Sequence, residues 1–151
     1  MTWYYKVTSD ISNLPAFIQH YEDELANARG DVIIRGNVEK NISALPGITE
    51  QRFNQLQEIE AVLRWMEIQL RQIRRKHFQK YLEAYNKVLS SRDAEKYTDG
   101  EQEVVDYECL ANEVALIRNK YLGVMKSLES KNFMLSNLVR LKCAGMESFS
   151  I

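Results

Sequence analysis

Two runs of apolar residues recur at alternating spacings of three and four, and this pattern most constrains the fold. The first run contains Leu56, Ile59, Leu63, Met66, Leu70, Ile73 and His77, and the second contains Tyr107, Leu110, Val114, Ile117, Tyr121, Val124 and Leu128. Residues at this spacing form a stripe along a helix that packs against another helix. Neither Gly nor Pro occurs from residue 48 to residue 99. We therefore expect a long helix at roughly 50–90, a loop at roughly 91–99 and a second helix at roughly 100–129.

The short connection between the two heptad helices predicts that they fold back on each other as an antiparallel pair. Thr98 and Glu101 have the spacing of a capping box, which predicts where the second helix begins. Tyr81, Tyr85 and Val88 continue the first stripe at spacings of four, four and three. In such a hairpin, residues 68–82 are expected to lie beside roughly residues 108–122.

Residues 1–48 predict a small mixed α/β cap that precedes the helical region. Trp3–Val7 and Val32–Ile34 are rich in aromatic and β-branched residues, which are typical of strands. The segment between them has a helical stripe, with Pro15 suited to its first turn. Pro46-Gly47 predicts a turn that closes the cap. The expected fold is mainly α: this cap (1–48) and a helical domain (49–151) built on a long antiparallel hairpin or coiled coil.

The segment 130–145 predicts a separate C-terminal helix that is apolar around much of its circumference. A short apolar helix of this kind usually packs against something else. One face of it carries Phe133, Met134, Leu138 and Leu141, and we expect this helix to mediate homo-oligomer formation.

Several classes of protein are excluded by what the sequence lacks. No apolar run is long enough to span a membrane, and the first residues lack the layout of a secretion signal. Two cysteines do not make a disulfide scaffold, so we expect a cytoplasmic protein without a membrane partner. Glycine-rich phosphate loops are missing, and His20 and His77 lie far apart in the pattern. We therefore expect no enzymatic activity, no catalytic residues, no metal and no cofactor.

The formal net charge of −1 is an average over segments of opposite sign. Residues 68–82 carry five bases and no acid, and residues 93–113 carry eight acids and one base. We call the five bases the basic track: Arg71, Arg74, Arg75, Lys76 and Lys80. Cations without interleaved acids suit a phosphate backbone, and the nearby Phe78, Tyr81 and Tyr85 offer rings to unpaired bases. The alternative is a solvated helix flank that pairs with acids of the second helix.

The closing segment resembles a motif of the UvsY recombination mediator family of large tailed bacteriophages. It reads Ser130-Lys131-Asn132-Phe133-Met134-Leu135-Ser136-Asn137-Leu138-Val139-Arg140-Leu141. With the basic helix and charged connection before it, the resemblance covers roughly residues 49–146. It implies cooperative single-stranded DNA binding by Arg71, Arg74, Arg75, Lys76, Lys80 and Tyr81. It also implies closed oligomers formed through the C-terminal helical region, with an interface made by Phe133, Leu135, Leu138 and Leu141.

The same resemblance implies a role in recombination and a set of protein partners. A protein of this family helps a RecA-like recombinase replace the single-strand binding protein, without hydrolysing ATP itself. Its location would be the cytoplasm of an infected bacterial host. A second hypothesis is a phage structural or assembly protein, built on the same antiparallel helices and without nucleic-acid binding. Oligonucleotide binding at moderate salt distinguishes the two.

Overall fold

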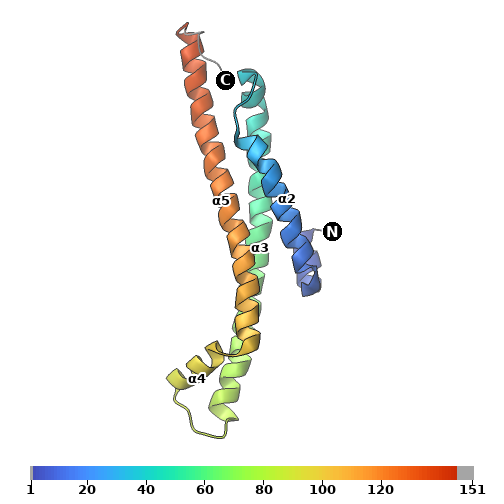
Figure 1. The fold of residues 1–151 in the computed structure, drawn as a ribbon, viewed down its shortest axis with the longest axis vertical. Helices are drawn as coiled ribbons and strands as arrows, with labels where there is room; N and C mark the ends of the chain where they lie inside the picture. Colours follow the sequence, from blue (N-terminus) through green and yellow to red (C-terminus); the bar gives the residue numbers. More distant parts are fainter. Residues whose placement is uncertain (1, 146–151) are drawn as a thin grey trace.

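The computed structural model describes residues 2–145, and two long antiparallel helices dominate it (Figure 1). The elements in chain order are α1 (Trp3–Ser9), the 3₁₀ turn η1 (Ile11–Asn13), α2 (Leu14–Val32), α3 (Val38–Glu83), α4 (Ser91–Asp99) and α5 (Gln102–Cys143). Residues 2–145 contain no strand. The prediction of a mainly α fold is therefore confirmed, and the helices α3 and α5 form its hairpin.

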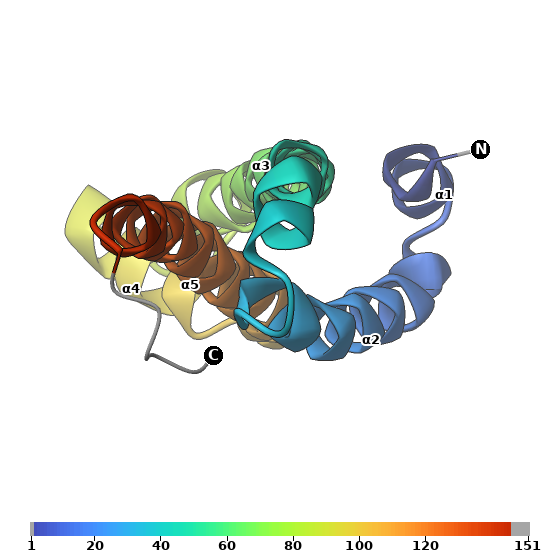
Figure 2. The same cartoon turned by 90° about the horizontal axis from the view of Figure 1, so that it is seen from above.

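The predicted N-terminal α/β cap is wrong, because neither of the two segments predicted as strands forms a strand. Trp3–Ser9 is helical, and its Val7 is fully buried in the core formed with the other helices. Val32 ends α2, and Ile33 and Ile34 lie in the loop that follows it. Seen along the long axis, α1 and α2 lie to one side of the α3–α5 pair (Figure 2). Packing onto that pair outweighs the β-propensity of the aromatic and β-branched residues.

The helix α3 begins much earlier than predicted and contains the proposed Pro46-Gly47 turn in its interior. Its first residue is Val38, and the side chain of Asn37 caps it by accepting a hydrogen bond from the amide of Lys40 at 3.2 Å. Pro46 lacks an N–H group, so one backbone hydrogen bond of the helix is missing there. Val38 and Leu45, before the proline, are buried in a cluster with α5, and the partly buried Ile48, after the proline, packs against the same cluster. This packing explains why the helix continues past the proline.

The connection between α3 and α5 also differs from the prediction. The helix α3 ends at Glu83, and Val88, predicted to continue its stripe, is fully exposed. The whole predicted loop is the helix α4, capped by Ser90, whose hydroxyl accepts a hydrogen bond from the amide of Asp93 at 3.2 Å. Thr98 does not cap α5: it is buried in α4 and donates its hydroxyl to the carbonyl of Ala94 at 2.7 Å. The predicted capping box is therefore wrong.

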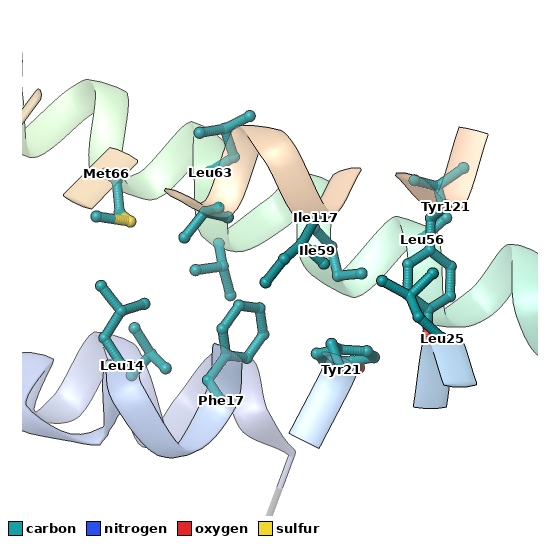
Figure 3. Close-up of a cluster of buried hydrophobic side chains, with 13 residues drawn as sticks. Leu14, Phe17, Tyr21, Leu25, Leu56, Ile59, Leu63, Met66, Ile117 and Tyr121 are labelled. Carbon is teal, nitrogen blue, oxygen red and sulfur yellow. The ribbon is translucent and has the colours of Figure 1, made fainter. Parts of the chain in front are cut away.

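The main core lies where α2 packs into the groove between α3 and α5 (Figure 3). The stripe of α2 predicted from the sequence contributes four buried residues, Leu14, Phe17, Tyr21 and Leu25. The first heptad run buries Leu56, Ile59, Leu63 and Met66, and the second buries Val114, Ile117, Tyr121 and Leu128. The periodic stripes therefore face each other, as the spacing predicted.

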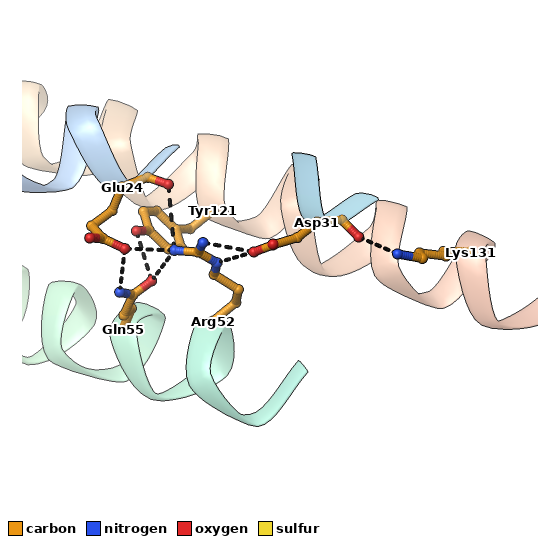
Figure 4. A network of polar contacts seen from close by, with 6 residues as sticks. All are labelled: Glu24, Asp31, Arg52, Gln55, Tyr121 and Lys131. Atoms are coloured by element: carbon orange, nitrogen blue, oxygen red, sulfur yellow. Dashed lines mark hydrogen bonds and ion pairs between the residues drawn. The ribbon is translucent and has the colours of Figure 1, made fainter. Parts of the chain in front are cut away.

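A polar network joins α2, α3 and α5 beside this core (Figure 4). The guanidinium of Arg52 is buried and lies 2.7 Å from a carboxylate oxygen of Glu24 and 2.7 Å from one of Asp31. Gln55 bonds both Arg52 and Glu24, and it accepts the hydroxyl of Tyr121 at 3.0 Å. Hydrogen bonds from Gln55 and Arg52 keep the pKa of Glu24 below its usual value. These bonds fix how α2 sits against the hairpin.

The predicted separate C-terminal helix is the last part of α5, which runs without a break from Gln102 to Cys143. Gly145 follows it at φ 77°, in the left-handed conformation that glycine adopts readily at the end of a helix. None of the helices in residues 2–145 has an apolar stretch long enough to cross a membrane.

Candidate nucleic-acid interface

The basic track lies on the last third of α3, where α4 and the beginning of α5 pack against it. Its residues point in three directions because a helix turns by about 100° per residue. Arg74 reaches the end of α4 and the body of α5, whereas Lys76 and Lys80 reach the start of α5. Arg71 and Arg75, one turn apart, are exposed and line a hollow together with residues of α4.

Carboxylates from residues 99–108 bind three of the five cations. Arg74 forms ion pairs with Asp99 and, at 3.2 Å, with Glu108. The ammonium of Lys80 lies 2.8 Å from a carboxylate oxygen of Glu101. The fourth pair, Lys76 with Glu103, measures 3.3 Å. We call Asp99, Glu101, Glu103 and Glu108 the acidic clasp.

The ring of His77 lies between the two central carboxylates of the clasp. Its Nε2 atom is 2.7 Å from Glu103, and its Nδ1 atom is 3.7 Å from Glu101. The hydroxyl of Tyr81 also donates a hydrogen bond to Glu101. Hydrogen bonds from Lys80 and Tyr81 lower the pKa of Glu101, and those from His77 and Lys76 lower the pKa of Glu103. Both carboxylates are therefore held in their charged form.

The position of these pairs corrects the predicted register of the hairpin. Residues 68–82 were expected beside roughly residues 108–122, but their ionic partners are residues 99–108. The prediction extended the first helix to residue 90. Because α3 stops at Glu83, its basic end lies closer to the start of α5. Pairing between the basic track and the acidic second helix, the alternative left open by the sequence, occurs for Arg74, Lys76 and Lys80.

The remaining two cations line a hollow between α3 and α4. Its volume is about 300 Å³, and its lining consists of Arg71, Arg74, Arg75, Phe78, Glu95 and Thr98. Within residues 2–145, Arg71 and Arg75 form no ion pair. The unpaired guanidinium groups of Arg71 and Arg75 beside the ring of Phe78 provide donors for phosphate oxygens and a surface for a base.

An aromatic group that the sequence analysis missed lies at the same end of the hairpin. The rings of Tyr81 and Tyr97 are stacked with their centroids 5.3 Å apart, and Tyr85 lies 5.3 Å from Tyr81. Tyr97 was overlooked because it falls in the segment predicted as a loop. Ser90 and Asp93 have the spacing of a helix N-terminus, and this signal would have identified α4.

The four residues predicted at the oligomer interface have different environments. Phe133 is 66% exposed, Leu141 is exposed and Leu138 is half-buried. Leu135 is only 1% exposed, because it packs against Val38, Leu45 and Leu128 of its own chain. Leu135 is therefore not accessible to a second subunit in this structure.

The described part of the chain contains no cluster of three or more His, Cys, Asp or Glu residues that could hold a metal ion. Cys109 and Cys143 are both exposed and free. Comparisons of the chain with protein-family models, with curated proteins and with solved structures gave no match.

Proposed function

We propose that this protein binds single-stranded DNA through the exposed arginines of the basic track, Arg71 and Arg75, and acts without catalysis. The observation that carries the proposal is the hollow lined by Arg71, Arg74, Arg75 and Phe78. Arginine forms strong, bidentate hydrogen bonds with phosphate, and aromatic rings stack on unpaired bases. Tyr81, Tyr85 and Tyr97 extend this aromatic surface along the same end of the hairpin.

The salt dependence of binding follows from which cations are available. If Arg71 and Arg75 are the main phosphate contacts, two condensed counterions are displaced. The logarithm of the binding constant should then fall with the logarithm of salt concentration with a slope of about −1.4, at about −0.7 per contact. This slope is small, so the proposal predicts binding of modest affinity, in the micromolar range.

The test uses the double variant Arg71→Glu and Arg75→Glu with a fluorescently labelled single-stranded oligonucleotide. Arg74 is left unchanged, because its reversal would also break its pairs with Asp99 and Glu108. Fluorescence anisotropy should show affinity at least about tenfold weaker at moderate salt, and a slope near zero.

The matched control reverses the charge of two exposed arginines far from the track, with Arg29→Glu and Arg35→Glu. It changes the net charge by the same amount and should bind much like the wild type. Equal binding by the wild type and the Arg71/Arg75 variant, with helicity unchanged by circular dichroism, would reject the proposed site.

The more specific role follows from the sequence resemblance and extends the proposal. A recombination mediator would help a RecA-like recombinase replace a single-strand binding protein on DNA. The assay is the DNA-dependent ATPase activity of a RecA-like recombinase on single strands coated with single-strand binding protein. Addition of this protein should shorten the lag, and the Arg71/Arg75 variant should not.

A second candidate function is that of a helical assembly protein that binds no nucleic acid. The observation that favours it is the acidic clasp, which binds three of the five cations of the track. The exposed side chains of Phe133, Met134 and Leu141 would then contact other subunits. Absence of oligonucleotide binding at low salt, together with a stable oligomer, would favour this candidate over the first.

A further inference from the structure

The contacts of the acidic clasp involve the groups that a nucleic acid would use. Carboxylate oxygens of Glu101 and Glu103 lie 2.8 and 3.3 Å from the ammonium groups of Lys80 and Lys76. Phosphate oxygens accept charge-assisted hydrogen bonds from the same donors at similar distances. The clasp therefore occupies the binding positions of three cations of the track.

The clasp is also placed so that it can be displaced. The side chains of Lys76 and Lys80 are 67% and 50% exposed, and those of their partners Glu103 and Glu101 are 47% and 21% exposed. Exposed ion pairs contribute little net stability, because water and salt compete with them. A polyanion that supplies several phosphates at once can therefore replace individual carboxylates. The clasp spans the end of α4 and the first turns of α5, and most of its partners lie on a single helix, α3.

We infer that the acidic clasp is an intramolecular competitor that covers Arg74, Lys76 and Lys80 and thereby limits DNA affinity. While the clasp is in place, Arg71 and Arg75 are the cations of the track that remain available to bind a phosphate backbone. Binding that displaces the clasp recruits the other three cations, so neutralising the clasp strengthens binding. This inference rests on the proposed function, because it concerns the regulation of the same surface.

The test is the clasp variant, Glu101→Gln with Glu103→Gln, which frees Lys80 and Lys76 from charged partners. Glutamine keeps a side-chain oxygen that can accept their hydrogen bonds, so the change is mainly electrostatic. Two additional phosphate contacts should make the salt slope steeper by about 1.4. At about 0.15 M salt, the same two contacts should tighten binding to a single-stranded oligonucleotide roughly tenfold.

The matched control is Asp106→Asn with Glu113→Gln, two exposed acids on α5. In residues 2–145 neither forms an ion pair with a base, and the control changes net charge as much as the clasp variant does. A gain confined to the clasp variant supports competition by the clasp. Equal gains in both variants would show that only overall charge matters, and would overturn the inference.

The other outcomes separate the inference from the proposed function. If the wild type binds through Arg71 and Arg75 but the clasp variant gains nothing, the inference alone is wrong. If neither the wild type nor the clasp variant binds, both are wrong. Binding by the clasp variant alone supports a clasp that masks the surface completely. Glu108→Gln, which frees Arg74 from one partner, repeats the test if the double variant loses helicity.

Discussion

Removal of the buried charge of Arg52 should destabilise the protein strongly. The perturbation is Arg52→Met, which keeps an unbranched apolar side chain of similar length but removes the guanidinium. Glu24 and Asp31 would then face each other without the cation that both contact at 2.7 Å. We expect the free energy of unfolding to fall by about 3 kcal/mol.

The magnitude follows from the geometry of the two ion pairs. At 2.7 Å and an effective dielectric constant of about 20, each pair contributes roughly 6 kcal/mol of gross Coulomb attraction. The cost of removing three charged groups from water offsets most of that attraction in the wild type. Loss of one partner of a buried pair typically costs about 3–5 kcal/mol. Both carboxylate side chains retain 24% exposure and can recruit water, so we expect the lower end of this range.

The assay is urea unfolding followed by circular dichroism at neutral pH. Arg64→Met provides the control, because Arg64 is an exposed arginine on the same helix; its change should stay within about 0.5 kcal/mol. Adding Glu24→Gln and Asp31→Asn to Arg52→Met should recover much of the lost stability, since no unpaired charge remains. A loss below about 1 kcal/mol for Arg52→Met would refute the reasoning, as would a triple variant no more stable than the single one.

Two further predictions concern pH and the end of α5. The lowered pKa values of Glu101 and Glu103 mean that the unfolded chain binds more protons near pH 4.5, so the melting temperature should drop as pH falls below that value. The clasp variant should show a smaller drop than the Asp106/Glu113 control, and identical profiles would contradict the prediction. Phe133→Asp should dissociate an oligomer in light scattering without loss of helicity, whereas Leu135→Asp should lower the melting temperature because Leu135 is buried in its own chain. A wild type that is monomeric at tens of micromolar would contradict the expected oligomer.

The hairpin was predictable because its signal is periodic and long. Seven consecutive stripe positions on each of two segments leave little choice but two helices packed along their length. The predicted strands at Trp3–Val7 and Val32–Ile34 failed for the opposite reason. Short aromatic or β-branched runs have weak intrinsic preference, and packing of Val7 into the core decided for a helix.

Two predictions from local turn and loop signals in the sequence were also wrong. Pro46-Gly47 is a strong turn signal by itself, yet the helix continues through it because Leu45 before it and Ile48 after it pack in one cluster with α5. The residues predicted as a loop, 91–99, form α4, whose N-cap Ser90 is a start signal present in the sequence. The choice of residues for the candidate site came from the sequence. The sequence could not predict which of these residues remain unpaired, because ion pairing depends on the register of α3 against α5.

The sequence by itself determined the helical hairpin, the faces that its helices bury and the concentration of positive charge near the end of the first helix. These properties are local or periodic, so neighbouring residues are enough to specify them. Only the tertiary structure decided that Arg74, Lys76 and Lys80 meet the acidic clasp while Arg71 and Arg75 remain outside it. That division depends on where α3 ends and how α4 packs against it. A shift of a few residues between α3 and α5 would give these cations different carboxylate partners. Attraction between exposed charges is screened beyond about 8–10 Å at physiological salt, so the register sets which cations are free to bind.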